Sequence, residues 1–399
     1  MQIAMQRLQK SHIFFLFLHR QSKKELIFRL MTLHIFNPEH DIALAANLSN
    51  FTAPRAGRQL RHDLGFLPAL WAKEGDGVLV DDVEYAERQL ETFYSQLERY
   101  GLSSVFPLGI HRIPLRNTSY SPVEYGIVEP WGWDRAVCSM LKRHGFNENL
   151  LPSDEQLQRI RMLSHRRTTA RLLPLLQMTG TVGEAFECTT IEEVQALLAR
   201  YGQLMLKAPW SSSGRGVRPM KSDENASQTE KWAVNVLKSQ GNVMVEPYYQ
   251  KVMDFGMEFT ALENSALRYD GLSLFQTQNG AYTGNLLATE RKKREIASRY
   301  IPLSLLDSIQ QKITECLNLQ DYRGPLGIDM MIVEKDGRGK MEDGRKFLLH
   351  PCVEINLRRT MGHVALSLTP AEDDRLLTMS ITYDGSHYLF NIKESQIDF

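Results

Sequence analysis

The sequence predicts an α/β protein made of more than one unit. Its 399 residues exceed what one ordinary hydrophobic core supports and fit two or three units. Between Met31 and Pro152, short apolar segments of strand length alternate with stretches of helical spacing, which is typical of a small parallel α/β domain. Beyond Pro152, apolar strands that each carry one or two charged or amide residues lie among further helices. We therefore expect an α/β fold in which the later strands carry the chemistry.

The composition gives no support for several functional classes. Lysine and arginine together number 47, as do aspartate and glutamate, so no broad surface for nucleic acid or membrane is indicated. The chain has four cysteines, without a CxxC motif or the spacing of metal ligands: Cys138, Cys188, Cys316 and Cys352. We expect a reduced, cytoplasmic protein without structural zinc.

The first thirty residues do not resemble the rest. The apolar run at residues 13–18 is too short to span a bilayer, and a basic segment follows it instead of the small residues of a signal cleavage site. Met31 directly precedes a segment that reads as a first strand and its loop. We expect residues 1–30 to be a non-native or disordered extension; a poor signal peptide is the alternative.

Residues 31–152 are expected to form the N-terminal α/β domain. Residues 77–81 form a compact apolar strand, residues 83–100 have helical spacing, and residues 104–107 resemble another strand. The polar stretch at residues 147–153, which contains Pro152, marks the boundary.

Helices and strands continue to alternate beyond this boundary. A capped helix is predicted from Ser153 towards Arg167, and a second over residues 168–178, which Pro174 would kink or divide. We also predict helices over residues 189–201 and 230–240, a strand over residues 242–246 and a turn at residues 336–345.

Lys207 ends an apolar strand and is followed by a Ser/Gly loop at residues 211–216. Small residues let a backbone close around an anion, so the loop is a candidate phosphate cradle and Lys207 its point charge. The alternatives are an ordinary turn and a lysine that extends to water at a strand end. The loop lacks the Gly-Lys-Ser/Thr ending of a Walker loop and the third glycine of a dinucleotide fingerprint.

Asp329, Glu354 and Asn356 lie in two otherwise apolar strands. Glu354 and Asn356 are two positions apart, so both side chains leave the same face of a strand. Burial of carboxylates in such strands is costly unless a cation compensates, and oxygen ligands suit Mg²⁺. The alternative is a strand whose polar face is open to solvent.

These segments, taken in order, resemble the ATP-grasp superfamily over residues 163–368. The motifs are Arg166-Arg167, Lys207 with its loop, Glu246-Pro247-Tyr248, Gly327-Ile328-Asp329 and Glu354-Ile355-Asn356-Leu357-Arg358. The resemblance implies two α/β lobes that clamp ATP, preceded by a small parallel α/β domain. The expected divisions are 1–30, 31–152, a first lobe at 153–245, and a second lobe with the metal site at 246–399.

The resemblance also implies roles for single residues. Lys207 would contact phosphate oxygens together with Ser212, Ser213, Gly214 and Gly216 of the loop. Arg166 or Arg167 stands where many members carry a lysine. Glu246, Pro247 and Tyr248 match the hinge whose backbone pairs with adenine, and either Asp254 or Glu258 would bind ribose. Asp329, Glu354 and Asn356 match the metal ligands, and Arg358 matches an arginine that faces the reacting acyl phosphate. Arg358 and Lys207 are thus the catalytic candidates.

A carboxylate–amine ligase is the expected activity, with ATP and two Mg²⁺ ions, or Mn²⁺ in their place, as cofactors. The carboxylate would be activated as an acyl phosphate and attacked by an amine or another nucleophile of a small molecule or peptide. A small-molecule kinase and a nucleotide-binding regulatory protein without turnover are the alternatives. We expect no nucleic-acid or membrane partner, and we expect the chain to be a monomer or homodimer.

A few further residues leave their role open. His40 follows the first strand and would either face substrate or stabilise a turn. The basic run at residues 291–294 would hold an acidic substrate or form a solvated helix face. His350 and His363 are more simply read as structural histidines, and Trp131 and Trp133 as core.

Overall fold

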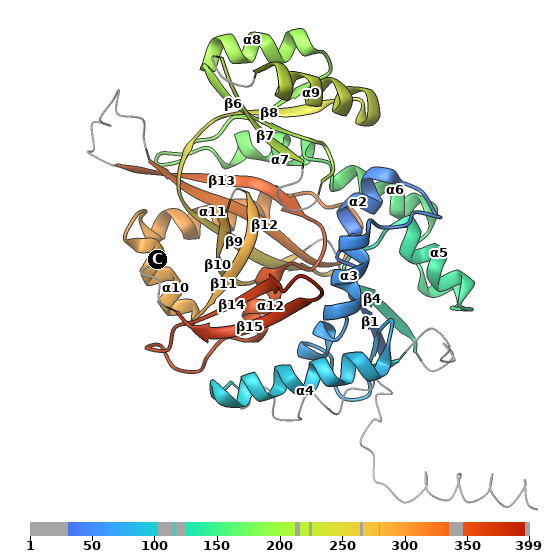
Figure 1. The fold of residues 1–399 in the computed structure, drawn as a ribbon. Coiled ribbons are helices and arrows are strands. Elements are labelled where there is room, and N and C mark those ends of the chain that lie inside the picture. Colours follow the sequence, from blue (N-terminus) through green and yellow to red (C-terminus); the bar gives the residue numbers. More distant parts are fainter. Residues whose placement is uncertain are drawn as a thin grey trace, which may run out of the picture.

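The structure is a computed structural model, and it describes residues 31–102, 115–116, 125–211, 216–222, 226–263, 266–278, 280–334 and 346–395. The predicted extension at residues 1–30, the strand at 104–107 and the turn at 336–345 therefore lie outside the described residues. The described chain is an α/β fold, as predicted, with one parallel and two antiparallel sheets (Figure 1).

The N-terminal part is built on a four-stranded sheet in the order β3-β2-β1-β4, with every pair parallel. Its strands are β1 (Thr32–Ile35), β2 (Gly77–Leu79), β3 (Leu115–Arg116) and β4 (Ile127–Pro130). Its helices are α2 (His40–Ala46), α3 (Arg55–Leu64), η1 (Leu67–Leu70), α4 (Val83–Arg99), α5 (Arg135–Arg143) and η5 (Glu148–Leu150). The parallel sheet and the long helix α4 confirm the predictions for this region.

The next part is a four-stranded sheet in the order β5-β8-β6-β7, with antiparallel pairs. Its strands are β5 (Phe186–Cys188), β6 (Gln203–Lys207), β7 (Val217–Lys221) and β8 (Val243–Pro247). Helices α8 (Ile191–Tyr201) and α9 (Ala226–Gln240) lie against it at the top of Figure 1, and their buried Val194 and Ala233 share its core.

Three short helices lead into this lobe: α6 (Asp154–Leu163), α7 (Arg167–Leu172) and η6 (Leu173–Leu176). Ser153 and Gln156 form a capping box at the start of α6, as expected from the sequence. The helix predicted to run to Arg167 ends earlier, at Leu163. Pro174 divides the following helix as predicted, because proline cannot donate the backbone hydrogen bond that would continue an α-helix.

The largest sheet has seven strands in the order β13-β12-β9-β10-β11-β14-β15. They are β9 (Gln250–Ala261), β10 (Leu267–Gln278), β11 (Ala281–Leu287), β12 (Gly324–Glu334), β13 (Phe347–Asn356), β14 (Leu377–Tyr383) and β15 (Tyr388–Glu394). The associated helices are α10 (Glu290–Ser298), α11 (Leu303–Cys316) and α12 (Met361–Ser367).

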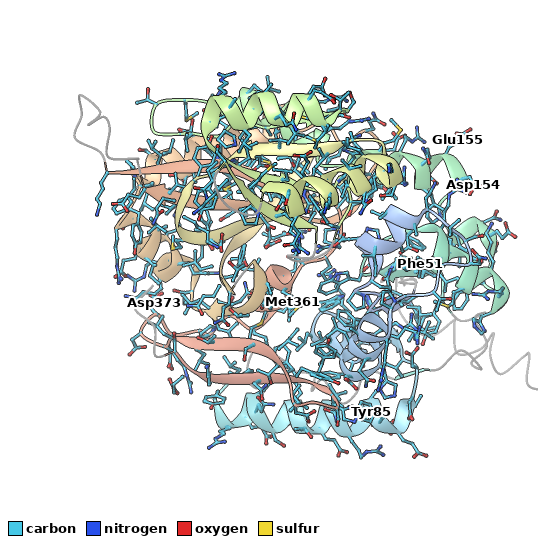
Figure 2. All side chains as sticks on the ribbon, turned by 45° about the horizontal axis from the view of Figure 1, so that its top comes forward. Phe51, Tyr85, Asp154, Glu155, Met361 and Asp373 are labelled. Carbon is cyan, nitrogen blue, oxygen red and sulfur yellow. The ribbon has the colours of Figure 1, made fainter. Side chains whose placement is uncertain are left out.

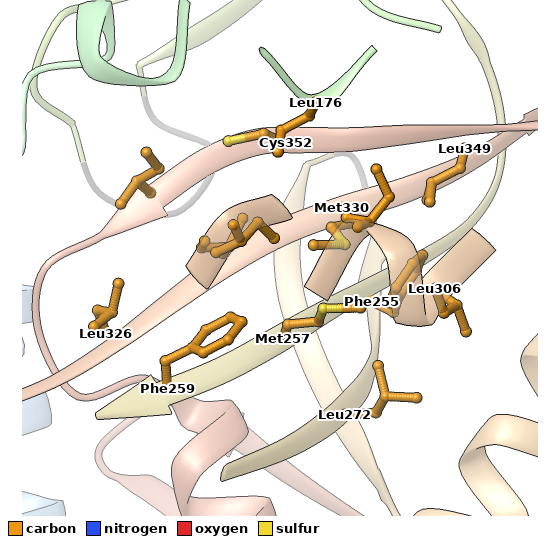
Figure 3. Packing of buried hydrophobic residues seen from close by; sticks show 14 of the residues in the cluster. Leu176, Phe255, Met257, Phe259, Leu272, Leu306, Leu326, Met330, Leu349 and Cys352 are labelled. Atoms are coloured by element: carbon orange, nitrogen blue, oxygen red, sulfur yellow. The ribbon is translucent and has the colours of Figure 1, made fainter. Parts of the chain in front are cut away.

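One face of this sheet is apolar. Phe255, Met257 and Phe259 alternate along β9 and pack with Met330 of β12 and Leu306 of α11 (Figure 3). Each fully buried side chain of this size contributes about 1.5–3 kcal/mol to folding. Because side chains alternate along a strand, the residues between them reach the opposite face of the sheet.

That opposite face is polar where β9, β12 and β13 lie side by side. Glu258 stands opposite Gly327, and Asp329 stands between Gly256 and Glu354 in the strand register. The sheet thus fixes two carboxylates on neighbouring strands and a third close by.

The parallel-sheet domain and the seven-stranded sheet share a hydrophobic core. Phe66 and Phe93 from the N-terminal domain pack together with Phe390 of β15 and Val364 of α12. Tyr85 of α4 lies at the same junction, near the β14–β15 hairpin (Figure 2). Among the described residues, no helix combines the length and apolar character needed to cross a membrane.

Candidate functional site

The metal candidates Asp329, Glu354 and Asn356 come together at the ends of β12 and β13. Asp329 and Glu354 are direct partners across the two strands, and Asn356 Nδ2 donates to Asp329 Oδ2 at 3.1 Å. Asn356 is buried and both carboxylates are half-buried, so this is not a strand face open to solvent. Burial, then the charges of Glu354 and Glu258, raises the pKa of Asp329 to about 8.

This donor set fits a magnesium ion that also binds phosphate. Within the described ranges, no three His, Cys, Asp or Glu side chains are arranged to hold a metal by themselves. Two acids and one amide are nevertheless what Mg²⁺ uses when substrate phosphates complete its coordination. Burial of Asp329 beside Glu354 disfavours its charged form, and a cation bound between the two carboxylates would offset that cost.

Arg166 connects this acidic pair to the loop after β6. Its Nη1 donates to Ala208 O and to Ser211 Oγ, the latter at 2.7 Å, and its Nη2 donates to Glu354 Oε1 at 2.7 Å. Only 6% of Arg166 is exposed. Arg167 turns the other way and pairs with Glu187 of β5. Of the two arginines that the sequence left open, Arg166 is the one that faces the metal candidates.

Lys207 is buried, and its ammonium donates to Glu246 Oε1 at 2.6 Å and to Val353 O at 3.2 Å. The interpretation of a lysine that extends to water is therefore wrong. Lys207 stands opposite Met244 of β8, and Glu246 lies two positions further along that strand, on the same face of the sheet. The Glu246 carboxylate neutralises the buried ammonium. This pair was not predicted from the sequence, where only the backbone of Glu246 was given a role.

The predicted hinge begins in β8. Pro247 stands opposite Leu204 of β6, and Tyr248 N donates to Gln203 O at 3.1 Å. That donor is used within the lobe and is therefore not free to pair with a base.

The Ser/Gly loop joins β6 to β7 as a hairpin. Lys207 stands opposite Val217, and Ala208 N donates to Gly216 O at 2.7 Å. A Cβ on Gly216 would lie 2.2 Å from the Ser211 side chain, so only glycine allows this closure. Ser212, Ser213 and Gly214 lie outside the described residues, and their phosphate role stays a prediction.

The two candidate ribose acids differ in access. Asp254 on β9 accepts hydrogen bonds from Thr277 Oγ1, at 2.7 Å, and from Lys251. Glu258 is 2% exposed and accepts from Thr360 Oγ1 at 2.8 Å, and a Cβ on Gly362 would lie 1.8 Å from it. Glu258 is thus enclosed, and Asp254 is the more accessible acid.

Arg358 follows β13 and pairs with Asp41 at the start of α2. Its Nη2 donates to Asp41 Oδ2 at 2.8 Å and to Asn356 Oδ1 at 3.0 Å. Burial opposes ionisation of Asp41, but the Arg358 guanidinium prevails and lowers the pKa of Asp41. Asp41 was not among the site residues predicted from the sequence.

A hollow lies where these elements meet. Trp210 forms part of its wall. The Arg161 guanidinium lies 3.8 Å from the centroid of the Trp210 indole, and the Arg161 carbonyl accepts a hydrogen bond from Trp210 Nε1. Its lining residues are Asp41, Leu44, Ser164, Pro209, Trp210, Ser211, Glu354, Ile355, Asn356 and Leu357. Arg166 and Arg358 both bond to side chains of this lining.

The remaining candidates are structural. His40 is 1% exposed, and its Nδ1 lies 3.3 Å from Asp134 Oδ2. A Cβ on Gly132 would lie within 2.6 Å of the His40 ring, so the ring packs under a loop of its own domain. His363 bonds to Thr360 at the start of α12, and Trp131 packs edge-on against Phe36.

The basic run at residues 291–294 lies on helix α10. Arg291 pairs with Asp373 and Arg294 with Asp307, both near the surface. Lys293 departs from the expected solvated face, since it is 2% exposed and donates to Leu272 O.

No protein-family model and no curated protein sequence matches the chain. Solved structures give matches of low identity. One is N5-carboxyaminoimidazole synthetase from Staphylococcus aureus complexed with ADP, with 11% identity, coverage of 88% of this chain and 82% of that chain, and a TM-score of 0.45.

Two other matches are of the same order. A biotin carboxylase–β-γ-ATP complex from Campylobacter jejuni has 11% identity, coverage of 90% and 78%, and a TM-score of 0.49. D-alanyl-alanine synthetase A from Vibrio cholerae has 13% identity, coverage of 62% and 69%, and a TM-score of 0.37. The similarity is one of general fold and does not extend to substrate or reaction.

Proposed function

We propose that this protein is an ATP- and Mg²⁺-dependent enzyme that joins a carboxylate to an amine or another nucleophile of a small molecule or peptide. The observation that carries the proposal is a set of hydrogen bonds that joins Arg166 to Glu354, and Arg358 through Asn356 to Asp329. Glu354 and Asn356 of this set line one small hollow. Positive side chains beside a magnesium-type donor set are what a transferring phosphoryl group requires.

The side chains divide the work by position. Arg166 spans from Ser211 to Glu354, so it can hold phosphate oxygens between the hairpin loop and the metal strand. Lys207 is buried and paired with Glu246, and its ammonium donates to the carbonyl of Val353 on β13, the strand that carries Glu354. Asp329, Glu354 and Asn356 would hold Mg²⁺, which neutralises phosphate charge when bound. The resemblance seen in the sequence supports these roles.

Arg358 and Asp41 connect this site to the N-terminal domain. Their paired hydrogen bonds bring the start of α2, just after the loop that follows β1, to the edge of the hollow. Ligands of open α/β sheets lie outside the carboxyl ends of the strands, where this loop begins. We infer that the carboxylate substrate approaches from this side and that Arg358 stabilises charge on the acyl phosphate.

A metabolite screen for ADP release tests this proposal. A ligase releases ADP only when both acid and nucleophile are present, whereas the alternative kinase needs a single acceptor. A regulatory protein would bind nucleotide without releasing ADP under any combination. Release of ADP with one hydroxyl compound alone would replace the ligase assignment by the kinase.

We also propose that the site binds two magnesium ions, with Mn²⁺ as a substitute, and that Asp254 or Glu258 binds ribose. The chain is further proposed to be a cytoplasmic monomer or homodimer. The domain divisions at residues 152 and 245 are likewise our proposal.

A further inference from the structure

A second cavity, of about 250 Å³, lies in the N-terminal domain at the carboxyl ends of β1 and β2. Helices α2, α3 and α5 surround it. In the strand order β3-β2-β1-β4, successive strands are added on one side of β1 up to β3, and β4 is then added on its other side. The order of strand addition therefore reverses at β1. Crevices at such switch points are where open α/β sheets bind ligands.

Glu39 is a buried acceptor on this cavity with one oxygen unused. Its side chain is 9% exposed, and its Oε1 accepts from Arg61 Nη1 at 2.6 Å. Its Oε2 is buried and has no hydrogen-bond partner among the described residues. A buried carboxylate oxygen without a donor is costly, so a donor is expected from outside the chain. A cavity needs only about 10–15 Å³ of such volume to hold one water, so this cavity has room for a larger molecule.

The charges on the cavity wall are balanced. Three arginines and three acids line it: Arg58, Arg61, Arg143, Glu39, Asp81 and Asp134. Arg61 bridges Glu39 and Asp81, the latter at 3.2 Å. Arg58 donates to Ala53 O and Arg143 to Ser139 O. A guanidinium has five N–H donors, so both keep donors for an anionic group. A wall that holds both guanidinium and carboxylate groups is complementary to a ligand that carries a positive and a negative charge.

This cavity is separate from the hollow at the metal candidates. Helix α2 and the residue before it stand between the two. Glu39 and Ala43 line the second cavity, whereas Asp41 and Leu44 line the hollow beside Glu354. No lining residue is common to both.

We propose that this cavity binds a zwitterionic small molecule of amino-acid size. Its ammonium group donates to Glu39 Oε2, and its carboxylate accepts from Arg58 or Arg143. The assignment does not depend on nucleotide binding, because the cavity and the hollow lie on opposite sides of α2.

Thermal unfolding of the full chain, without nucleotide, tests the proposal with each of the twenty common L-amino acids at 10 mM as probes. At least one is expected to raise Tm, and its N-acetyl derivative, which lacks the ammonium group, is expected to leave Tm unchanged. The Kd of the active amino acid should rise at least tenfold in Glu39→Gln. Glu87→Gln, on the exposed side of α4, is the matched control and should bind as wild type.

A second variant guards against a folding effect of Glu39→Gln. Ala136→Leu fills the cavity from α5 and leaves the Glu39–Arg61 pair in place, and it should also abolish the Tm shift. If no amino acid raises Tm, the cavity holds solvent only and the proposal is wrong. Equal binding of the N-acetyl derivative, or binding retained in both cavity variants, would also overturn it.

Discussion

Arg166 Nη2 donates to Glu354 Oε1 at 2.7 Å, although the two residues are 188 positions apart in the chain. The same side chain bonds to Ala208 and Ser211, at the entrance of the hairpin loop. One guanidinium therefore joins the lobe that carries the loop to the strand that carries the metal candidates. A phosphate group entering between them would meet a fixed positive charge.

Arg166→Met should lower ATP affinity or turnover by roughly 10- to 100-fold. Hydrogen bonds to charged groups are worth about 1.5–3 kcal/mol, and each 1.4 kcal/mol is a factor of ten. Arg167→Met is the matched control, because Arg167 pairs with Glu187 at a partly exposed site, where an ion pair contributes about 0–1 kcal/mol. Steady-state kinetics of both variants would separate the neighbours. Equal losses in the two would mean that Arg166 has no special place at the site.

Lys207→Met should reduce both stability and ATP affinity. Removal of one partner of a buried ion pair typically costs about 3–5 kcal/mol, since Glu246 would keep a buried charge without its counterion. The double variant Lys207→Met/Glu246→Gln should recover much of that stability, which urea unfolding would measure.

ATP affinity distinguishes the two roles of Lys207. If the ammonium contacts phosphate, the stable double variant still binds ATP at least tenfold more weakly than wild type, while adenosine binding changes little. Recovery of ATP affinity together with stability would make Lys207 a purely structural residue.

Glu354→Gln and Asp329→Asn test the metal candidates. Each substitution keeps the side-chain shape and removes one charge, so Mg²⁺-dependent turnover should fall by at least a hundredfold while the fold is retained. Circular dichroism checks the fold, and a Mg²⁺ titration of the remaining activity checks the metal. Glu187→Gln, on β5 at the surface, is the control and should behave as wild type. Wild-type turnover in Glu354→Gln would exclude Glu354 as a ligand.

His387 and Asp63 should make stability depend on pH. His387 Nδ1 lies 2.9 Å from Asp63 Oδ1, and this hydrogen bond raises the pKa of His387 above its usual 6.5. The pair joins α3 to the turn between β14 and β15. Its contribution should be full below about pH 6.5 and be lost as pH rises through the folded-state pKa. Because His387 is half-exposed, we expect a small effect.

Asp63 acts at the acidic end. Burial opposes its ionisation, but hydrogen bonds from His387 and from the backbone of Tyr388 lower its pKa. The stability that ionised Asp63 contributes is present above about pH 4 and is lost as pH falls further. The free energy of unfolding in urea, measured for wild type between pH 5 and 9, should show a step near neutral pH. This step should be absent in His387→Gln. His144→Gln, an exposed histidine after α5, should keep the step. A step that persists in His387→Gln would rule out this assignment.

Local patterns in the sequence were enough to predict most helices and strands. The spacing of Glu354 and Asn356 predicts a common face, and the structure has Asn356 bonded to Asp329 on the neighbouring strand. Asp329 and Glu354 are direct partners because β12 and β13 are antiparallel neighbours, which no local pattern specifies.

Partners from distant segments were not predictable. Nothing near Lys207 in the sequence indicates Glu246, and nothing near Arg358 indicates Asp41, because tertiary packing decides both pairs. The enclosure of Glu258 depends on Gly362 and Gly327, two glycines that approach it from other elements. A short period-2 pattern in β9, with Asp254, Gly256 and Glu258, was the one available sign that Glu258 shares a face with the site.

Nucleotide binding is the measurement that tests the central claim most directly. Thermal unfolding of the wild-type chain should be followed with ATP or ADP, each with and without Mg²⁺. A ligand at a hundred times its Kd stabilises the folded state by about 2.7 kcal/mol, so Tm should rise with nucleotide and rise further with magnesium. Adenosine at the same concentration should give a smaller shift. If millimolar ATP with Mg²⁺ leaves Tm unchanged, the site does not bind nucleotide and the proposed function is wrong.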